Sequence, residues 1–326
     1  MQSFNFATTK HIISAPGAID QIAHICHTLH IARPLIVTDA GIIACGLLHE
    51  LETQLRDAAI AFSVFGDVEH DPQETVINAG VEHARQSQCD GVIGFGGGSS
   101  MDSAKLIAIL MHSQQDLSDI YGIDNVTTGR LPLILIPTTA GTGSEVTPIS
   151  IITTGETTKQ AVVDKALLPD VALLDAQLTL GLPAHVTAAT GIDALVHAIE
   201  AYTSKIKKNP YSDMLAKEAI VLLSSHIKTA TFDGSNIAAR QAMLLGACLA
   251  GQAFANAPVA AVHALAYPLG GHFHIPHGLS NSLVLPHVLR FNASHCQKLY
   301  SELGKLVLTI NEIANASSEQ ICQLFI

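Results

Sequence analysis

An acid and an imidazole stand four residues apart in the segment TGIDALVHAIEAY, residues 190–202. Residues i and i+4 of a helix share one face, so Asp193 and His197 would meet on one turn beside an apolar stripe. A carboxylate and an imidazole placed in this way can bind one divalent metal ion together. A lone histidine on an apolar face is more often a core residue, so the pair alone leaves both interpretations open.

Four more histidines, His263, His272, His274 and His277, fall within the short apolar and glycine-rich segment 257–283. Burying so many imidazoles without a partner would be costly, so the cluster favours a metal site. One carboxylate with several neutral imidazoles suits divalent Fe, Zn or Mn, and a set of four protein ligands leaves room for water or substrate. Spacing alone does not decide which imidazoles bind, because His272 and His274 compete with His263 and His277.

A glycine-rich loop, GFGGGSSMDSAK at residues 94–105, directly follows an apolar run that is typical of a strand. Its consecutive glycines let backbone amides approach an anion, and Ser99 with Asp102 forms an S-x-x-D pattern that predicts a helix cap. A pyrophosphate would bind at the N-terminus of that helix. The alternative is an ordinary glycine-rich turn, because the loop matches neither G-x-G-x-x-G nor a Walker A motif.

A second loop, IPTTAGTGSEVT at residues 136–147, leaves another predicted strand and offers hydroxyl groups around two glycines. Asp39 ends the first nucleotide-type strand, where a carboxylate can accept hydrogen bonds from ribose hydroxyls. A helix N-cap is an equally good interpretation of Asp39. The hydroxyl groups of the second loop belong to Thr138, Thr139, Thr142 and Ser144.

These candidate residues must be positioned by a parallel sheet in the first half of the chain. Continuous apolar runs alternate there with helical patterns, which predicts a parallel sheet covered on both faces. Residues 149–164 form two extended arms around Gly155, as a hairpin would. The apolar runs are residues 34–39, 61–68, 90–98, 131–139 and 170–176.

After about Pro183 the pattern changes to long Ala- and Leu-rich segments of helical period, at residues 184–203, 210–228 and 236–254. The sequence therefore predicts an α/β dinucleotide-binding domain over residues 1–182 and an all-helical metal-binding domain over residues 183–326. We expect the two domains to enclose one cleft.

Composition excludes several classes of protein. Lys and Arg number 17 against 28 Asp and Glu, a net charge of −11, and no basic run is present, so nucleic acid is not an expected partner. The mean hydropathy is +0.35, but no apolar run approaches the roughly 18 residues that span a membrane. The N-terminus lacks a signal-peptide pattern, and the six cysteines form no C-x-x-C pair. We expect a soluble, cytoplasmic protein.

Taken in order, the motifs resemble those of the iron-containing, group III alcohol dehydrogenases. The resemblance covers nearly the full sequence and implies a Rossmann-like NAD(P) domain followed by an all-α metal-carrying domain, as in the dehydroquinate synthase-like fold. The chain is similar to the lactaldehyde/propanediol oxidoreductase-type and butanol dehydrogenase-type members, and a homodimer or higher homo-oligomer is expected. The matching segments are GFGGGSSMDSAK, PTTAGTGSEVT, LPDVALLDAQLTLGLP, GIDALVHAIEAY and HALAYPLGGHFHIPHG.

The family pattern assigns residues to the metal and to the cofactor. It implies Fe²⁺, with Zn²⁺ as the alternative, and leaves His272 and His274 outside the ligand set. We expect NAD rather than NADP, because the Asp39 carboxylate would repel a 2′-phosphate. The implied metal ligands are Asp193, His197, His263 and His277. The implied cofactor residues are Asp39, Gly97, Gly98, Ser99, Asp102, Thr138, Thr139, Thr142, Ser144 and Lys159.

Two features depart from the family pattern. Members carry another histidine four residues after the third ligand, often assigned to proton transfer, whereas this chain has Tyr267. We expect Tyr267 to pack beside the nicotinamide rather than relay a proton, which His272, His274, ribose hydroxyls or water would then pass. Relatives also continue through further helices, while this chain stops just after Ser317 and Gln320 predict a helix start. The helical domain is therefore expected to be shortened at its C-terminus and to expose apolar surface.

These expectations describe a metal-dependent, NAD-linked oxidoreductase acting on CH–OH groups, an alcohol dehydrogenase or aldehyde reductase for small primary alcohols or diols. The metal would act as a Lewis acid on the alcohol oxygen while hydride passes to nicotinamide. His277 and Tyr267 are the candidate catalytic residues, and Phe254 would supply an apolar wall for the substrate. The alternatives are a relative of glycerol dehydrogenase or dehydroquinate synthase, with a different ligand pattern, and a non-catalytic NAD-binding protein.

Overall fold

The computed structural model describes residues 3–155, 158–273 and 275–326. The chain forms two compact units. The α/β unit consists of Thr8–Thr139 and Ser144–Thr179, and the helical unit consists of Met1–Ala7, Ala140–Gly143 and Leu180–Ile326.

The α/β unit contains a six-stranded sheet in the order β1-β9-β6-β4-β2-β3, and all its paired strands run parallel. The five strands predicted from apolar runs are confirmed. The strand at the exposed edge, β1, was not predicted, because most of its residues face solvent and it lacks an apolar run. The strands are β1 (His11–Ser14), β2 (Pro34–Asp39), β3 (Ser63–Val68), β4 (Gly91–Gly96), β6 (Leu133–Pro137) and β9 (Val171–Leu174).

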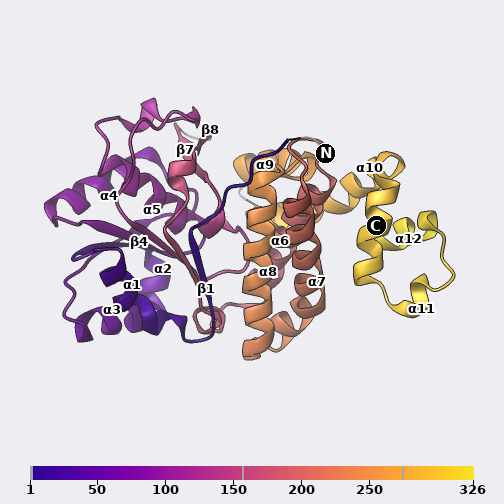
Figure 1. Ribbon diagram of the computed structural model, residues 1–326, viewed down its shortest axis with the longest axis horizontal. Coiled ribbons are helices and arrows are strands. Elements are labelled where there is room, and N and C mark those ends of the chain that lie inside the picture. The colour runs from indigo at the N-terminus through magenta and orange to yellow at the C-terminus, as the bar shows by residue number, and fades with distance from the viewer. Residues whose placement is uncertain (1–2, 156–157, 274) are drawn as a thin grey trace. The chain divides into compact units, whose positions relative to one another are not determined.

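Helices cover both faces of this sheet, which is why its strands are apolar throughout (Figure 1). Side chains alternate along a strand, so in β2 the residues Leu35 and Val37 join one hydrophobic core while Ile36 joins the other. The first core is closed by α4 and α5, and the second by α1 and α3. These helices are α1 (Ile22–Thr28), α3 (Leu48–Asp57), α4 (Glu74–Gln86) and α5 (Gly98–Leu110).

A smaller three-stranded sheet, in the order β5-β8-β7, accompanies the main sheet. Its strands β7 and β8 pair antiparallel, which confirms the predicted hairpin, and Gly155 after β7 has a φ of +61°. The strands are β5 (Gly122–Ile123), β7 (Ile149–Thr154) and β8 (Thr158–Val163). The unit also contains the short helices η1 (Ala18–Gln21), α2 (Ala40–Ala44), η2 (Leu117–Asp119), η3 (Ser144–Val146), η4 (Lys165–Leu167) and η5 (Ala176–Thr179).

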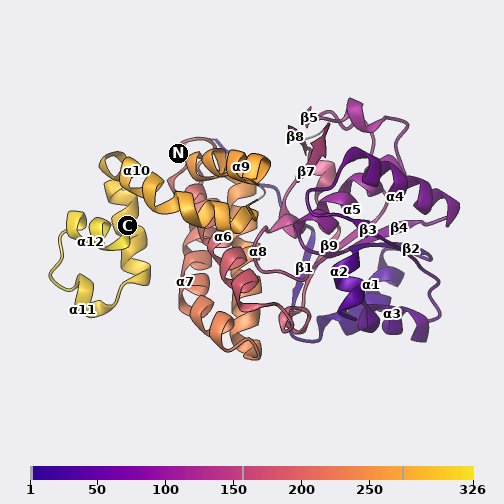
Figure 2. The ribbon, with the colours of Figure 1, turned by 180° about the vertical axis from the view of Figure 1, so that it is seen from behind.

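The helical unit is built around α6, α7 and α8, and these three helices confirm the predicted periodic segments (Figure 2). Asn209 caps α7 by accepting a hydrogen bond from the Ser212 amide, and Asn236 caps α8 by accepting one from the Ala239 amide. Both helices therefore begin close to where the sequence predicts. Its helices are α6 (Ala184–Thr203), α7 (Pro210–Phe232), α8 (Ile237–Asn256), α9 (Ala261–Phe273), α10 (His277–Val307), α11 (Ile310–Ile313) and α12 (Ser318–Phe325).

The last helix, α12, begins at the predicted capping box. The Ser317 hydroxyl accepts a hydrogen bond from the Gln320 amide at 3.2 Å, and the Gln320 side chain accepts one from the Ser317 amide at 2.8 Å. Ile321 and Cys322 are the buried residues of this helix. The S-x-x-Q pattern therefore marked a real helix start.

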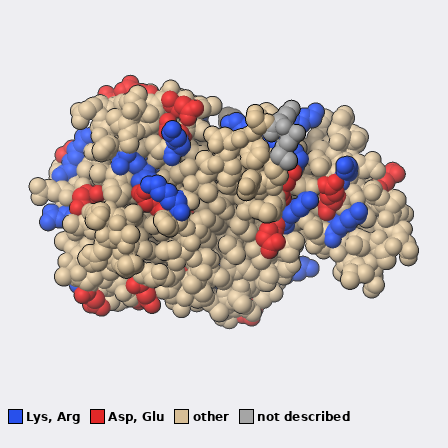
Figure 3. Space-filling model, viewed as in Figure 1, with Lys and Arg blue, Asp and Glu red and all other residues tan. Residues whose placement is uncertain are grey.

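One helix among the described residues, α8, is long and apolar enough to cross a membrane by length and composition alone. However, 61% of its most apolar window is buried inside the fold, which is typical of a core helix. On the surface shown in Figure 3, Lys and Arg side chains are interspersed with Asp and Glu.

Candidate functional site

Four side chains of the helical unit converge on one point. Asp193 and His197 project from α6, His263 from α9, and His277 is the first residue of α10. The ligand atoms of the four residues all lie within 4.8 Å of one another. The Asp193 Oδ1 atom lies 4.0 Å from Nε2 of His197, 3.8 Å from Nε2 of His263 and 3.6 Å from Nε2 of His277.

The protonation states of this cluster suit a metal ion. Burial on its own would raise the pKa of Asp193, but the three neighbouring imidazoles outweigh burial and hold that pKa below its usual range. Burial lowers the pKa of His197 to about 4, because the imidazolium form is poorly solvated there. At pH 7 Asp193 is therefore a carboxylate and His197 a neutral imidazole, which are the forms that bind metal.

The distances between the donor atoms of this cluster suit a bound divalent ion. Oxygen and imidazole donors each lie about 2 Å from a Zn-type ion, so the atoms of one ligand set are separated by no more than about 4 Å. The spacings of 3.6 to 4.0 Å around Asp193 meet this limit. His277 is 38% exposed whereas the other three are buried, so one side of the cluster is open to an incoming molecule.

The amide of Asn281, one turn after His277 on α10, lies among the candidate ligands. Its Nδ2 atom donates to Asp193 Oδ1 at 2.5 Å and lies 3.2 Å from His277 Nε2 and 3.3 Å from His263 Nε2. An amide nitrogen only donates, so these contacts are consistent with unprotonated Nε2 atoms on both imidazoles. The Asn281 amide therefore borders three of the four candidate ligands.

A close helix crossing brings His277 to α6. A Cβ atom added at Gly278 would lie 2.3 Å from the Ala189 carbonyl oxygen and 2.7 Å from its carbonyl carbon. Contacts below 3 Å with backbone cannot be relieved by a side-chain rotation. Only glycine allows the first turn of α10 to approach α6 this closely, and His277 is the preceding residue.

The remaining residues predicted around the metal are placed as follows. His272 is exposed in the last turn of α9 and lies outside the cluster of four, and His274 falls outside the described residues. The Tyr267 ring lies 5.8 Å from the His277 ring at an interplanar angle of 30°. The Phe254 ring stacks on His197 with its centroid at 4.4 Å. Both aromatic rings therefore border the candidate metal site.

The candidate cofactor residues of the α/β unit gather at one edge of the main sheet. The strands β2, β4 and β6 are parallel neighbours, so their carboxyl ends meet at the same edge. Asp39 ends β2, Gly97 follows β4, and Thr138 and Thr139 follow β6. Open α/β sheets bind ligands at this edge.

Asp39 serves as a helix N-cap. Its Oδ1 atom accepts a hydrogen bond from the Ile42 amide at 3.0 Å, and its Oδ2 atom accepts one from the Ser100 hydroxyl at 3.4 Å. The cap interpretation is therefore confirmed. A carboxylate can accept several hydrogen bonds, so ribose binding by Asp39 stays a prediction.

The loop after β4 starts α5 differently from the S-x-x-D prediction, which is wrong. The N-cap is Gly97, with extended backbone and no side-chain hydrogen bond to the helix, so Ser99 lies inside the first turn. The tight entry depends on Gly96, which has a φ of +147°, and a Cβ atom added there would lie 2.7 Å from the Ser100 hydroxyl oxygen. An N-terminus without a side-chain cap leaves its amides for an anion, as a phosphate-binding loop requires.

A buried polar cluster centred on Lys105 lies behind this loop. The Lys105 ammonium is fully buried and donates to Asp102 Oδ1 at 3.2 Å, Ser144 Oγ at 2.7 Å, Thr147 Oγ1 at 3.2 Å and the Ile149 carbonyl at 2.6 Å. Burial lowers the pKa of Lys105, and the neighbouring Asp102 carboxylate opposes that effect. The cluster joins α5 to η3 and β7.

Two predicted cofactor residues belong to this cluster. The Ser144 hydroxyl donates to Asp102 Oδ1 at 2.5 Å, and the Ile151 amide donates to Asp102 Oδ2 at 3.0 Å. Both side chains thus support the loop from within the protein, and their direct contact with a cofactor stays a prediction. Thr142 is half-buried and belongs to the helical unit, unlike the neighbouring Ser144.

Lys159, predicted to contact the cofactor, pairs with Asp71 in the loop between β3 and α4. Its ammonium lies 2.6 Å from Asp71 Oδ1 and 3.1 Å from Thr153 Oγ1. A hydrogen bond from His70 is the main cause that holds the pKa of Asp71 below its usual range, and Lys159 adds to the effect. The Lys159 side chain keeps 27% exposure, so the pair can still meet a ligand at the surface.

Several residues of the site escaped the sequence analysis. Glu200 accepts a hydrogen bond from His263 Nδ1 at 2.7 Å. Burial would raise the pKa of the Glu200 carboxyl, but this bond and the bonds from backbone amides outweigh burial and hold the pKa below its usual range. Asn281 and Lys105 were likewise missed. A signal existed for Glu200, which lies seven residues after Asp193 and so on the same helical face. The spacing of Asn281, four residues after His277, was a similar signal.

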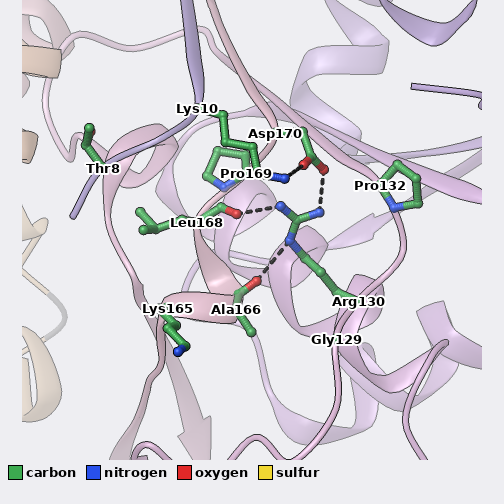
Figure 4. Close-up of a pocket in the computed structure, with 10 residues that line it drawn as sticks. All are labelled: Thr8, Lys10, Gly129, Arg130, Pro132, Lys165, Ala166, Leu168, Pro169 and Asp170. Carbon is green, nitrogen blue, oxygen red and sulfur yellow. Dashed lines mark hydrogen bonds and ion pairs between the residues drawn. The ribbon is translucent and has the colours of Figure 1, made fainter. Parts of the chain in front are cut away.

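A surface cavity of about 460 Å³ lies elsewhere in the α/β unit, around Arg130 (Figure 4). The guanidinium donates to Asp170 Oδ2 at 2.6 Å and to the carbonyl oxygens of Ala166 and Leu168, and Lys10 lies 2.7 Å from Asp170 Oδ1. These bonds tie together the segments that flank β6 and β9. None of the candidate cofactor residues lines this cavity.

Comparison with known proteins agrees with this geometry. Residues 9–176 match the family model of iron-containing alcohol dehydrogenase, and residues 187–325 match that of the Fe-containing alcohol dehydrogenase family, C-terminal. The chain is 38% identical to "Probable alcohol dehydrogenase EutG" of Escherichia coli (strain K12) over 98% of this chain and 82% of that protein.

Two further relatives are similar over most of their length. "Long-chain-alcohol dehydrogenase 1" of Geobacillus thermodenitrificans (strain NG80-2) is 46% identical over 88% of this chain and 73% of that protein. The crystal structure of a 1,3-propanediol oxidoreductase superposes with a TM-score of 0.95 at 36% identity, covering 99% of this chain and 84% of that one. The chain therefore belongs to the iron-containing alcohol dehydrogenase family, whose named members are oxidoreductases acting on CH–OH groups.

Proposed function

We propose that this protein is a metal-dependent, NAD-linked alcohol dehydrogenase and aldehyde reductase that acts on small primary alcohols or diols. The observation that carries the proposal is the convergence of Asp193, His197, His263 and His277 within 4.8 Å. Structural histidines do not need to gather three Nε2 atoms around one carboxylate oxygen. A divalent ion explains the arrangement.

Each residue of the cluster has a definite task in this proposal. A bound divalent ion supplies Lewis-acid polarisation of an alcohol or carbonyl oxygen, and a bound nicotinamide supplies hydride chemistry. Asp193 contributes the negative charge of the ligand set, and the low pKa of His197 keeps its lone pair available at neutral pH. The half-exposed His277 borders the open side, where a substrate oxygen can enter.

We assign Fe²⁺ as the metal, with Zn²⁺ as the alternative, since the donor set accepts both. NAD rather than NADP is the proposed cofactor. The uncapped N-terminus of α5 would bind the pyrophosphate, and Asp39 at the end of β2 would bind the ribose hydroxyls. The hydrogen bonds of the fully buried Lys105 would hold α5, η3 and β7 together at this edge of the sheet.

The proposed substrate is an uncharged alcohol, because the rings of Phe254 and Tyr267 lie beside the histidines. Among the relatives, one is named for 1,3-propanediol and another for long-chain alcohols, so chain length is the property to measure. A series of primary alcohols from ethanol to dodecanol, together with 1,3-propanediol, tests this. Higher kcat/KM for the short members supports the proposal, and a maximum at the long members contradicts it.

We further propose that residues 1–182 form the cofactor domain and residues 183–326 the metal domain. A cytoplasmic homodimer or higher homo-oligomer is the proposed physiological form. Light scattering coupled to size-exclusion chromatography measures the mass directly, and a mass equal to the 34.3 kDa chain would contradict the oligomer.

The decisive experiment combines metal analysis with a coupled assay. Protein purified without oxygen is assayed for bound iron and zinc, and oxidation of NADH by propanal is followed by absorbance. His277→Ala should lose bound metal and activity while NAD still binds, because a missing ligand weakens the hold on the ion. His272→Ala is the matched control, since that imidazole is exposed and outside the cluster.

Two results would contradict the proposed function. A His277→Ala protein that keeps stoichiometric metal and wild-type turnover would show that the cluster is not the metal site. A wild-type protein that holds metal and NAD but reduces no aldehyde of the series would favour a non-catalytic NAD-binding protein.

A further inference from the structure

A buried carboxylate on α6 joins the segment that carries His263. Glu200 is 4% exposed and accepts three hydrogen bonds. Its Oε2 atom accepts from His263 Nδ1 at 2.7 Å and from the Ala260 amide at 2.9 Å, and its Oε1 atom accepts from the Val262 amide at 2.7 Å. One side chain therefore fixes both the imidazole and the backbone at the start of α9.

These bonds determine which imidazole nitrogen of His263 carries the proton. An ionised carboxylate only accepts hydrogen bonds, so Nδ1 must be the protonated nitrogen. The Nε2 atom then carries the lone pair that a metal ion would bind, and this atom lies 3.8 Å from Asp193 Oδ1. The Asn281 Nδ2 atom lies 3.3 Å from the same Nε2 atom, a contact that this tautomer can accept.

The orientation of His263 also affects its neighbour. The His197 ring stacks on the His263 ring with centroids 4.7 Å apart, and Phe254 covers its other side at 4.4 Å. The Nδ1 atom of His197 is buried and has no hydrogen-bond partner among the described residues. His197 is thus oriented by packing against His263, whereas His263 is oriented by a carboxylate.

We propose that Glu200 is the positioning residue of the metal site. Glu200 fixes the Nδ1–H tautomer and the ring orientation of His263 before the metal binds. The proposal rests on the metal site of the proposed function. Carboxylates that hold a ligating imidazole in this way change metal affinity ten- to hundredfold when removed. Glu200 acts through His263 and touches neither metal nor substrate in this role.

The test compares Glu200→Gln and Glu200→Met with wild type and with Glu302→Gln. Glutamine keeps the size of the side chain but replaces one acceptor oxygen with a donor, and methionine removes both acceptors. Glu302 is a suitable control, because it is a partly buried acid of the same helical unit whose hydrogen bond comes from the Tyr202 hydroxyl.

The first measurement is made on metal-free protein with ¹⁵N-labelled histidine. The ring nitrogen shifts of His263, assigned by their loss in His263→Gln, report the tautomer directly. We expect Nδ1–H alone in wild type and in Glu302→Gln, and a mixture of tautomers in the Glu200 variants. A change of stability without a change of tautomer would show a merely structural role and overturn the proposal.

The second measurement is the dissociation constant for Zn²⁺, obtained by competition with a chromophoric chelator. We expect both Glu200 variants to bind Zn²⁺ at least about tenfold more weakly than wild type, and Glu302→Gln to bind it normally. If Glu200→Gln binds Zn²⁺ with wild-type affinity and keeps a single Nδ1–H tautomer, the role of Glu200 is overturned while the proposed function stands. Absence of Zn²⁺ and Fe²⁺ binding in wild type overturns the proposed function and this inference together.

Discussion

The aromatic residue beside His277 differs from the histidine that the family pattern leads one to expect. Tyr267 lies with its ring 5.8 Å from the His277 ring and is 40% exposed. A phenol has an ordinary pKa near 10, so it is a poor proton relay at neutral pH. The structure places the ring beside the imidazole, and the expected packing of Tyr267 beside the nicotinamide stays a prediction.

We expect Tyr267→Phe to keep most of kcat and the same pH profile, because the ring contact survives. Tyr267→His should keep similar or higher activity and add an ionisation near neutral pH. The measurement is kcat against pH, with bound metal and NAD verified in each variant. Proton transfer by a positioned side chain contributes about a hundredfold or more, so a loss of that size in Tyr267→Phe would make the phenol a direct participant.

We expect Asp39, at the end of β2, to govern the preference between the two nicotinamide cofactors. A 2′-phosphate about 4 Å from its carboxylate would cost about 1 kcal/mol in water and about 4 kcal/mol at an effective dielectric of 20. The value at an effective dielectric of 20, which suits pairs near a protein surface, exceeds the 1.4 kcal/mol that corresponds to a factor of ten, so we expect at least about tenfold preference for NAD. Asp39→Asn should relax this preference, as should Asp39→Gly.

Asparagine is the sharper substitution because it also caps helices, so the bond to the Ile42 amide can be kept while the charge is removed. The measurement is the ratio of kcat/KM for NAD and NADP in each variant. An unchanged ratio in Asp39→Asn would place the discriminating residue elsewhere, and a change confined to Asp39→Gly would attribute the effect to the lost cap.

At the scale of elements, the crossing of α10 over α6 determines whether the two halves of the metal site meet. We expect Gly278→Ala to push the first turn of α10 away from the Ala189 carbonyl, because the added Cβ would otherwise lie 2.3 Å from that oxygen. Overpacking of this kind costs about 1 to 3 kcal/mol. His277 moves with the helix, so Zn²⁺ affinity should fall as well as thermal stability.

Gly271→Ala is the matched control, since a Cβ there meets no atom within 4 Å. Both variants are compared with wild type by thermal melting and by chelator competition. If Gly278→Ala kept wild-type metal affinity and melting temperature, the close approach of α10 to α6 would not be needed for the site.

The stability of the whole molecule should depend on a buried acid in η3. Glu145 is 2% exposed, and burial raises its pKa from 4.5 to about 7. The folded state thus holds this proton up to about pH 7, whereas the unfolded chain releases it near pH 4.5. Stability linked to Glu145 is therefore full below pH 4.5 and is lost as the pH rises to about 7.

We expect Glu145→Gln to remove this loss, which amounts to about 3 kcal/mol at 1.36 kcal/mol for each pKa unit. The measurement is the free energy of unfolding by urea at several pH values between 4.5 and 8. Glu69→Gln, at an exposed position, is the control. Parallel pH profiles for wild type and Glu145→Gln would show that Glu145 is ionised in the folded protein at neutral pH.

The sequence by itself determined the features that depend on neighbours along the chain. Apolar runs located five of the six strands of the main sheet. Helical period located α6, α7 and α8, and the i, i+4 spacing placed Asp193 and His197 on one face. The S-x-x-Q pattern at Ser317 marked the start of α12. Such local patterns carry their own physical cause, because side-chain direction repeats every 2 or 3.6 residues.

Only the tertiary structure decided which distant groups meet. Spacing left His272 and His277 as equal candidates until the crossing of α10 over α6 placed one in the cluster and left the other exposed. The Asp102 carboxylate meets Ser144 across 42 residues, and His263 meets Glu200 across 63 residues. These pairings follow from how helices and strands pack, and packing depends on the shapes of surfaces that no single stretch of sequence contains.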